Sequence, residues 1–211
     1  MPTRFDRRTT LTALATMGAG AMLPPTAHAA TQLLTPAQST GPFYPTDAMR
    51  FTDQDHDLVK ISGRVRAAGG EILWLKGQVF SGGDTPAPGA RVEIWQTDMN
   101  GRYLHTGDRA SHAGRDPDFQ GFGVSIADPD GFYRFRTIKP VPYPGRTPHI
   151  HVRVIDAGRT LTTQFYVADH ERNDRDGLWR RLTPDQRTAV AMRYVPRRDG
   201  AAEAVVDIRL G

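Results

Sequence analysis

Two histidines and two tyrosines stand out because their side chains, taken together, could hold a metal ion. His149 and His151 flank a single isoleucine in a stretch with the composition of a strand. Side chains two apart in a strand leave the same face, with α-carbons about 6.6 Å apart, so both imidazoles could bind one ion. Paired strand histidines also occur as surface or hydrogen-bonded core residues, so the pair alone leaves metal binding and packing both open.

The segment that precedes this pair is unusually stiff. Four of the nine positions from 140 to 148 are proline. Each proline fixes its own φ and biases the preceding residue toward an extended backbone. Such a loop would hold Tyr143 and Arg146 in fixed directions. Taken alone, the segment is better interpreted as an ordinary rigid turn that carries an exposed tyrosine.

A second tyrosine, Tyr103, follows a turn at 98–101 and, in a strand, would share a face with His105. Taken alone it reads as a half-buried core aromatic. Two phenols and two imidazoles in a chain without cysteine nevertheless make a distinctive donor set. Two phenolates suit ferric iron better than copper(I) or zinc. Because the pKa of phenol is about 10, only a strong Lewis acid would keep both ionised at neutral pH.

Composition excludes several classes of protein. The chain has 211 residues, 27 Lys+Arg against 23 Asp+Glu, and no cysteine. Disulfides, thiolate catalysis, zinc fingers and iron–sulfur clusters are therefore excluded for this chain. The basic residues are scattered and the net charge is only +4, so we expect no nucleic-acid partner.

Residues 1–29 have the order of an export signal. Arginines come first, a mild apolar run from 11 to 23 follows, and Ala27-His28-Ala29 supplies small residues for cleavage after Ala29. The run is too short to span a bilayer, so we expect no membrane span. The Arg7–Arg8 pair ahead of so weak an apolar run favours a twin-arginine signal over a general secretory one. We therefore expect a periplasmic or extracellular protein.

The rest of the chain divides into an extended N-terminal arm, residues 30–57, and one domain, residues 58–211. Short stretches of strand composition, separated by Gly, Pro and Asp turns, predict strands at 58–65, 72–80, 90–96, 131–139, 149–155, 161–167 and 204–210. One short C-terminal helix should begin after Thr183, with Gln186 completing a capping box, and end near Met192. This pattern predicts an all-β fold, an antiparallel sandwich or barrel with long loops.

The order of motifs resembles the intradiol ring-cleavage dioxygenases, the group of the protocatechuate 3,4-dioxygenases and catechol 1,2-dioxygenases. The resemblance covers about residues 35 to 170. Its motifs are TGPFYP at 40–45, GARVEIWQTD at 89–98, NGRYLH at 100–105, FQGFG at 119–123, DGFYRFRTIKP at 130–140, Tyr143-Pro144 with Arg146 and His149-Ile150-His151, and TTQFY at 162–166.

This resemblance implies a β-sandwich core that holds one non-haem Fe(III) per chain. The iron would be bound by two tyrosines, two histidines and a hydroxide. Matched position by position, the protein ligands are Tyr103, Tyr143, His149 and His151.

It also implies roles for residues around the ion. Arg146 matches the arginine beside the bound substrate and Gln164 a glutamine on the following strand, so both are candidate catalytic residues. Tyr143 would leave the iron when substrate binds and accept a proton. Gly41 and Pro42 match a segment that lines the substrate pocket.

The activity implied is cleavage of a catechol-type ring by O2, between its two hydroxylated carbons, to a cis,cis-muconate-type diacid. The partners are then a small aromatic diol and O2, with a homodimer or larger oligomer by analogy and no second, iron-free chain required. Gly145 stands where the iron-bearing chain of protocatechuate dioxygenases usually has tryptophan, so the substrate is left open. The alternatives are an exported binding or carrier module without catalysis, and an enzyme on the same scaffold that uses copper or zinc.

Overall fold

The computed structural model describes residues 33–109 and 114–211. The chain divides into two compact units, Met1–Thr31 and Gln32–Gly211, and the strands and helices described belong to the second. The predicted export signal at 1–29 lies outside the described residues. Across the two described stretches, no helix has both the length and the apolar character needed to cross a membrane.

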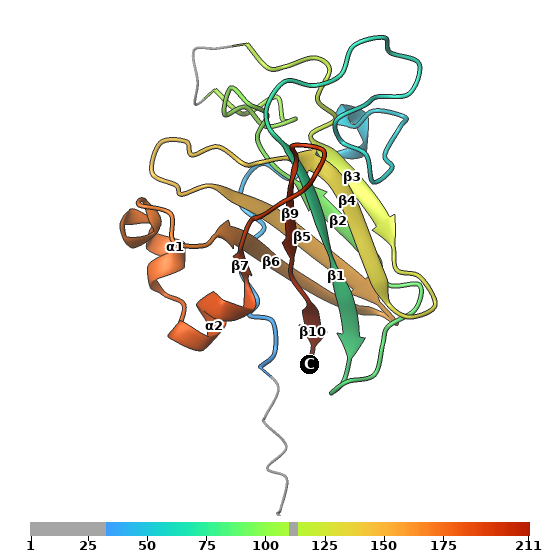
Figure 1. Ribbon diagram of the computed structural model, residues 1–211, viewed down its shortest axis with the longest axis vertical. Coiled ribbons are helices and arrows are strands. Elements are labelled where there is room, and N and C mark those ends of the chain that lie inside the picture. The colour runs from blue at the N-terminus through green and yellow to red at the C-terminus, as the bar shows by residue number, and fades with distance from the viewer. Residues whose placement is uncertain (1–32, 110–113) are drawn as a thin grey trace, which may run out of the picture. The chain divides into compact units, whose positions relative to one another are not determined.

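Two five-stranded sheets build the fold, which confirms the predicted all-β sandwich (Figure 1). In the first sheet the order is β10-β1-β9-β8, and β4 also pairs with β1. In the second it is β3-β2-β5-β6-β7. Most pairs are antiparallel, but β1–β9, β1–β10 and β6–β7 are parallel. The bounds are β1 Ile72–Ser81, β2 Arg91–Trp95, β3 Phe122–Ile126, β4 Phe132–Ile138, β5 His149–Asp156, β6 Arg159–Val167, β7 Ala191–Met192, β8 Val195–Pro196, β9 Ala202–Val205 and β10 Ile208–Leu210.

The core lies between the two sheets, and strand β5 shows how it is made. Ile150, Val152 and Val154 leave one face of the strand and are fully buried in the core cluster. His149 and His151 alternate with them and therefore leave the other face. The residue pattern thus turns an apolar surface inward and leaves both imidazoles on the outside of the second sheet, under the loops.

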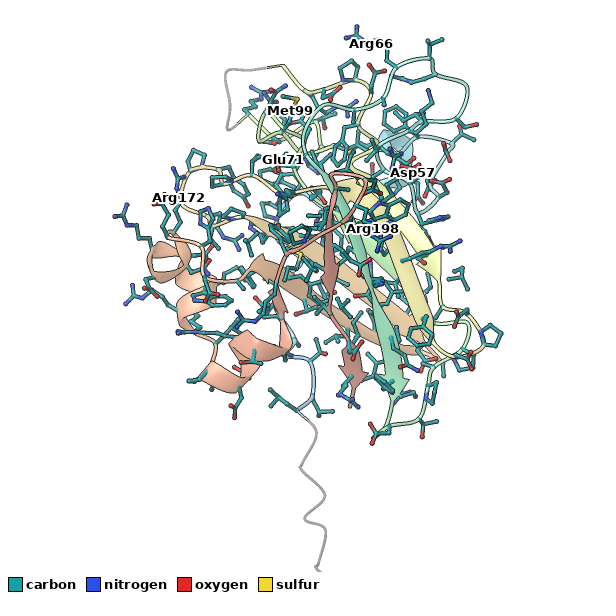
Figure 2. All side chains as sticks on the ribbon, in the orientation of Figure 1. Asp57, Arg66, Glu71, Met99, Arg172 and Arg198 are labelled. Atoms are coloured by element: carbon teal, nitrogen blue, oxygen red, sulfur yellow. The ribbon has the colours of Figure 1, made fainter. Side chains whose placement is uncertain are left out.

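Five of the predicted strands are confirmed to within two residues, and they become β1, β2, β4, β5 and β6. The strand predicted at 58–65 is wrong, because this segment is a series of turns. Leu58, Val59 and Ile61 each insert into the interior from these turns, whereas Val65 is exposed. Asp57, labelled in Figure 2, makes an isolated bridge with Arg136 and an ion pair of 2.9 Å with it. These contacts dock the segment on β4.

The last predicted strand, 204–210, is two strands separated by Val206 and Asp207. At the break, the Asp207 carboxylate accepts a hydrogen bond from the Gln78 amide of β1 at 3.0 Å. The Val206 carbonyl sits so close to Gly77 that a Cβ there would come within 1.9 Å of it. The Asp207 carboxylate therefore takes the place of a backbone carbonyl in the hydrogen bonding to β1. The strand predicted at 204–210 is interrupted at this point.

The predicted helix is confirmed as α2, Pro184–Ala189, with its Thr183–Gln186 capping box. It ends earlier than expected, because Ala191–Met192 leaves the helix to pair with β6 as strand β7. A four-residue helix, α1 Gly177–Arg180, was not predicted. Two 3-10 turns complete the list, η1 Asp47–Met49 and η2 Asn173–Arg175. Both α-helices lie at the β6–β7 side of the second sheet (Figure 1).

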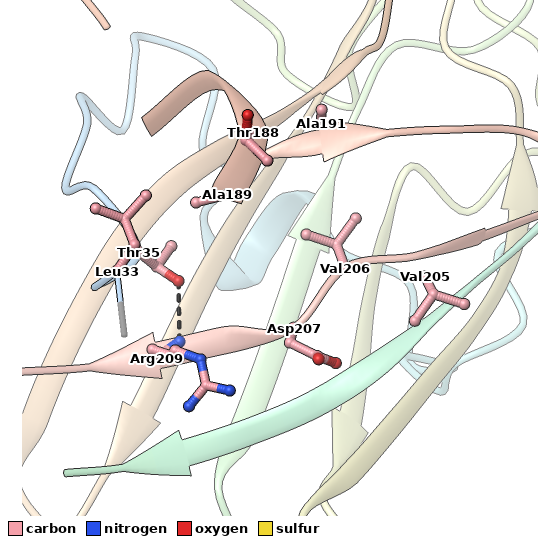
Figure 3. A pocket seen from close by; sticks show the side chains of 9 residues that line it. All are labelled: Leu33, Thr35, Thr188, Ala189, Ala191, Val205, Val206, Asp207 and Arg209. Carbon is pink, nitrogen blue, oxygen red and sulfur yellow. Dashed lines mark hydrogen bonds between the residues drawn. The ribbon is translucent and has the colours of Figure 1, made fainter. Parts of the chain in front are cut away.

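The N-terminal arm packs against both sheets. Thr35 exchanges hydrogen bonds with Arg209 of β10, at 3.1 Å to its carbonyl and 2.9 Å from its amide (Figure 3). A shallow pocket lined by Leu33 and Thr35 of the arm lies at this junction. Further along, the Gln38 amide bonds to the Thr162 carbonyl of β6 at 2.8 Å. These hydrogen bonds direct the arm along the sandwich toward His149 and His151. Our boundary between arm and domain at residue 58 stays a prediction.

Candidate metal centre

The register of the second sheet builds the floor of the site. Trp95 of β2 lies opposite His151, and Gln164 of β6 lies opposite the same histidine on its other side. Tyr166 lies opposite His149. Because directly opposed residues project to the same face of a sheet, these five side chains form two adjacent rows on the outer face.

The two tyrosines come from loops above this floor. Tyr103 Oη lies 3.2 Å from His149 Nε2, and Tyr143 Oη lies 3.5 Å from the same nitrogen. The ring centroids of His149 and His151 are 4.9 Å apart, and those of Tyr103 and His151 are 5.8 Å apart. The structure therefore brings together all four side chains that we expected to act as ligands.

Tyr103 does not lie in a strand with His105, and that expectation is wrong. Two buried carboxylates bind the backbone of this segment and replace a sheet partner. Asp98 accepts from the Arg102 amide at 2.9 Å, and Asp108 accepts from the Tyr103 amide at 2.7 Å. His105 instead accepts from the Gly107 amide in a local turn.

The histidine nitrogens are disposed as a metal site requires. His149 Nδ1 lies 2.7 Å from the Thr147 carbonyl, which can only accept, so Nδ1 carries the proton and Nε2 presents a lone pair to both phenols. His151 Nδ1 is buried and has no hydrogen-bond partner within the described part of the chain. Over that same part, no three His, Cys, Asp or Glu side chains gather to hold an ion, so a full ligand set needs the phenols. Two phenols and two imidazoles fit a hard, highly charged ion.

Burial controls the charge of these donors. Tyr103, His149 and His151 expose only 3%, 2% and 3% of their surface. Burial, helped by the charge of Arg146, lowers the pKa of His149 to about 3. Burial and the neighbouring His149 lower the pKa of His151 well below its usual range. Both imidazoles are thus neutral, which is the form that binds metals. Burial, with Tyr143 adding to it, raises the pKa of Tyr103 well above 10, so its ionisation calls for a nearby cation.

Arg146 is held rigidly beside Tyr143. Its Nε donates to Asp176 at 2.8 Å, its Nη2 to Gln164 Oε1 at 2.6 Å, and its Nη1 lies 3.4 Å from Tyr143 Oη. Burial opposes the charge of Arg146, but Tyr143 and Asp176 outweigh it and raise the pKa of the guanidinium. Because the guanidinium is planar and contacts three partners, its orientation is fixed.

Asp176 ties this arginine to the loop and to helix α1. Its Oδ2 also accepts from the Thr147 amide at 3.0 Å, and its Oδ1 caps α1 through the Leu178 and Trp179 amides. Burial works to raise the pKa of Asp176, but the hydrogen bonds from Thr147 and Arg146 prevail and hold it below the usual range. One carboxylate therefore fixes the end of the proline-rich loop.

The N-terminal arm closes the other side of the site. Gln164 Nε2 donates to the Ser39 carbonyl at 3.1 Å, which fixes the amide so that Oε1 faces Arg146. Gly41 has φ +71°, and a Cβ there would lie 3.2 Å from His151 Cε1. Gly41 thus lies against His151, and both Gly41 and Pro42 are exposed to solvent.

Sequence reasoning missed three residues of the site. Trp95 stacks on His151 with ring centroids 4.8 Å apart and planes 10° apart, and the period-two pattern of β2 could have placed it on that face. The Thr147 carbonyl has no sequence signal. Asp176 carries the signal of a helix N-cap, but nothing local connects it to Arg146 thirty residues earlier in the chain.

A pocket of about 290 Å³ opens beside Tyr143. The proline-rich loop lines one side of it, and the segment that leads into α1 lines the other. Its lining residues are Tyr143, Gly145, Arg146, Glu171, Arg172, Arg175 and Asp176. Tyr143 is the member of the four-residue cluster that lines this pocket.

Comparisons with known proteins converge on one group. A family model described as "Dioxygenase" matches residues 39–178. The beta chain of a protocatechuate 3,4-dioxygenase from Burkholderia cepacia is 39% identical over 121 residues, 53% of this chain and 51% of that protein. A hydroxyquinol 1,2-dioxygenase from Nocardioides simplex is 34% identical over 131 residues, 53% of this chain and 42% of that one. This chain therefore spans about half the length of these curated relatives.

Solved structures agree over a larger share of the chain. The dioxygenase domain of a dioxygenase carbohydrate-binding protein fusion from Streptomyces sp. SirexAA-E has a TM-score of 0.66 and 32% identity, covering 84% of this chain and 97% of that one. An intradiol ring-cleavage dioxygenase from Tetranychus urticae has a TM-score of 0.63 at 23% identity, covering 83% of this chain and 93% of that one. At 23% identity, the second similarity supports the fold assignment only.

Proposed function

Because the chain belongs to the intradiol ring-cleavage dioxygenase family, we propose that it is a non-haem Fe(III) enzyme. Its reaction would cleave a catechol-type ring with O2 between the two hydroxylated carbons and give a cis,cis-muconate-type diacid. One observation carries the proposal, namely the two phenol oxygens within 3.2 and 3.5 Å of His149 Nε2, with His151 beside them.

Tyr103, Tyr143, His149 and His151 would hold the iron. When bound, ferric iron supplies a Lewis acid that draws the diol oxygens into place and activates the ring toward O2. The protein's own part is to keep this centre dry and both imidazoles neutral, which the burial of three of the four side chains provides.

Tyr143 would accept a proton at the pocket, and Arg146 would stabilise negative charge there. Tyr143 is the half-buried member of the quartet and lines the pocket, so its Oη is the candidate acceptor for a diol proton. Arg146, 3.4 Å from that oxygen, would stabilise negative charge that develops on the substrate, since a guanidinium keeps its own charge. Gln164 would act as the residue that aims Arg146.

Oxygen uptake with a panel of catechols tests the proposal directly. We expect purified protein to contain one iron per chain, to absorb visible light through tyrosinate-to-iron charge transfer, and to consume O2 with catechol, hydroxyquinol or a substituted catechol. The ultraviolet spectrum of the product should be that of a muconate-type diacid. Binding of diols without O2 uptake would instead identify a carrier module, and copper or zinc in place of iron would identify a different enzyme.

We also propose that residues 1–29 direct export through the twin-arginine route, so that the enzyme acts in the periplasm or outside the cell. Replacement of both Arg7 and Arg8 by lysine should retain the protein in the cytoplasm, as cell fractionation would show. An unchanged distribution would point to a general secretory signal. A homodimer or larger oligomer, with no second iron-free chain, is the assembly we propose by analogy, and light scattering of purified protein tests it.

A further inference from the structure

A buried hydrogen bond ties the N-terminal arm to strand β2 next to the candidate metal centre. Tyr44 Oη donates to Glu93 Oε2 at 2.7 Å, and Arg91 Nε donates to Glu93 Oε1 at 2.8 Å. The Glu93 side chain is only 4% exposed. Charge-assisted hydrogen bonds of this length are among the stronger directional contacts in a protein. The proposed chemistry assigns no role to Tyr44 or Glu93.

The register of the second sheet places this bond beside His151. Glu93 and Trp95 are two apart in β2, so their side chains leave the same face of the strand. On the neighbouring strand β5, Arg153 lies opposite Glu93 and His151 lies opposite Trp95. The cross-strand row that contains Glu93 is therefore adjacent to the row that contains His151.

The Tyr44 side chain contacts both rows. Its hydroxyl binds Glu93, and its ring meets Trp95 edge-on, with centroids 4.9 Å apart and planes 83° apart. Trp95 in turn stacks on His151, with centroids 4.8 Å apart and planes 10° apart. Direct contacts therefore run from Glu93 through Tyr44 and Trp95 to His151.

Directional anchoring of these rings comes from the bond between Tyr44 and Glu93. Trp95 Nε1 and His151 Nδ1 are buried, and neither atom has a hydrogen-bond partner within residues 33–109 and 114–211. A hydrogen bond fixes direction as well as distance, because it weakens steeply when its angle departs from linear. The orientation of the stacked pair, Trp95 and His151, therefore depends on packing against a Tyr44 ring that Glu93 holds in place.

The same bond also fixes the arm segment that covers the centre. The backbone of Gly41 lies against His151, where a Cβ would come within 3.2 Å of Cε1. Phe43 stacks on Tyr103, with ring centroids 5.1 Å apart and planes 29° apart. Because Tyr44 follows directly in the chain, its bond to Glu93 sets where residues 41–43 lie on the sheet.

Resting on the proposed function, we propose that Glu93 and Tyr44 are positioning residues, which hold His151 through Trp95 in the orientation that binds iron. Neither side chain belongs to the four-residue cluster or lines the pocket beside Tyr143. His149 needs no such support, because its Nδ1 has its own hydrogen bond to a backbone carbonyl at 2.7 Å. The pair should therefore act on one imidazole of the site and leave the other in place.

Side-chain NMR of the metal-free protein tests whether the effect reaches His151. We compare the imidazole resonances of the wild type with those of Tyr44→Phe and Glu93→Ala. We expect the His151 resonances to shift in both variants and the His149 resonances to keep their wild-type positions. A general loosening of the fold would move both histidines. Equal shifts of the two histidines, or no shift of His151, would overturn the inference.

A second buried tyrosine provides the matched control. Tyr133 Oη donates to the Val206 carbonyl at 2.6 Å, and the Tyr133 ring belongs to the core between the two sheets. Tyr133→Phe therefore also removes a buried hydroxyl and its hydrogen bond, but away from the arm. It should leave the resonances of His149 and His151 at their wild-type positions.

Ferric iron affinity, measured by competition with a chelator, gives the consequence for the metal centre. We expect the Kd for iron to rise about tenfold in Tyr44→Phe and in Glu93→Ala, the lower end of the range for residues that orient metal ligands. Tyr133→Phe should keep the wild-type Kd.

A double variant and a conservative variant test the hydrogen bond itself. Tyr44→Phe/Glu93→Ala should bind iron no more weakly than Glu93→Ala alone, because both substitutions remove the same bond. Glu93→Gln should recover most of the affinity, since its amide oxygen can still accept from Tyr44 Oη. Additive losses in the double variant would overturn the inference.

The two measurements separate this inference from the proposed function. If the wild type binds no ferric iron, the proposed function fails, whereas NMR shifts confined to His151 still support the positioning of that imidazole. Iron binding and O2 uptake by the wild type, with equal iron affinity in Tyr44→Phe and Tyr133→Phe, overturn the inference and leave the dioxygenase assignment intact.

Discussion

The two histidines of the site are held by different forces. His149 is oriented by a hydrogen bond from Nδ1 to the Thr147 carbonyl at 2.7 Å. His151 has no such bond and is held between the Trp95 ring, with planes 10° apart, and the backbone of Gly41. One imidazole is thus fixed by a directional contact and the other by packing. Substitutions near His149 should therefore act by removing a hydrogen bond, whereas substitutions near His151 should act by changing the packing around its ring.

Removal of the Tyr143 hydroxyl should change the colour of the iron protein. Tyr143→Phe deletes one phenolate, so we expect the charge-transfer absorption to shift and weaken while the fold is kept, because Tyr143 is only half-buried. Visible spectroscopy at equal iron content is the measurement. Tyr194→Phe is the matched control, since the Tyr194 hydroxyl is buried without a hydrogen-bond partner in the described part of the chain. An unchanged spectrum in Tyr143→Phe would exclude Tyr143 from the ligand set.

A methyl group at Gly41 should disturb His151. Gly41 has φ +71° and its Cβ would lie 3.2 Å from His151 Cε1, so Gly41→Ala is both strained and crowded. Gly63→Ala provides the control, because Gly63 has φ +77° and nothing within 4 Å. We expect each variant to lose about 1 kcal/mol in its free energy of unfolding. Only Gly41→Ala should also lose iron affinity and kcat. Equal activity in the two variants would contradict a role for Gly41 in shaping the site.

At the scale of elements, the site depends on loops that are fastened by single side chains. The loop between β4 and β5 supplies Tyr143 and Arg146, and the segment after β6 supplies Asp176, which binds that loop at two points. The prolines limit the conformations of the loop, and Asp176 selects among those that remain. The sequence patterns predicted the first of these effects and not the second.

Loss of the Asp176 charge should destabilise this junction in a pH-dependent way. Asp176→Asn breaks a buried ion pair with Arg146, and we expect a loss of about 2–3 kcal/mol in the free energy of unfolding near pH 7. Because the pKa of Asp176 is lowered in the fold, its stabilisation is complete above the unfolded pKa of about 3.9 and is lost as the pH falls further.

Urea unfolding of wild type and Asp176→Asn at pH 7, 4 and 3 checks this expectation. The gap between the two proteins should narrow from pH 4 to pH 3. Asp185→Asn, which removes an exposed carboxylate in the first turn of α2, should show a much smaller gap at every pH. A gap for Asp176→Asn that is constant with pH would show that the carboxylate charge is not what stabilises the loop.

Strand β3 shows why some elements escaped prediction. Gly123 weakens the strand signal at 122–126, yet a Cβ at this position would come within 2.4 Å of Leu58 and 2.7 Å of the Asp55 carbonyl. The glycine is needed because the segment at 55–58 crosses directly over the strand. The low strand propensity of Gly123 therefore argues against a strand at 122–126, although the contact with the segment at 55–58 requires a glycine there.

At the scale of the whole molecule, the four predicted ligands come from three separate segments between residues 103 and 151, so a bound ion would cross-link the fold. At free iron 1,000-fold above its Kd, binding adds about 4 kcal/mol to stability. For a chain of this size we therefore expect chelation to lower Tm by about 8–16 °C. Calorimetry before and after chelation measures the change.

Metal specificity provides the control for that experiment. Ferric iron should restore Tm, whereas magnesium, which binds oxygen ligands in octahedral geometry, should not. A Tm that is indifferent to iron removal would mean that the four side chains do not share an ion.

The candidate donor set could be identified from residue types because donor atoms are local properties. The absence of cysteine, the presence of tyrosine and histidine in fixed motifs, and the alternation that puts His149 and His151 on one face all follow from short stretches of chain. The same holds for the prediction of five strands and of the α2 capping box.

The meeting of those donors depends on the folded chain. Tyr103 reaches His149 across forty-six positions, and Arg146 finds Asp176 thirty positions away. Such contacts depend on the register of the sheet and on the path of the loops, which buried carboxylates hold in place. Neither the register nor the loop path produces a periodic pattern in the sequence. The same reason hid the pairing of Trp95 with His151, since the partner of a strand is chosen by packing between distant segments and not by the residues of either strand alone.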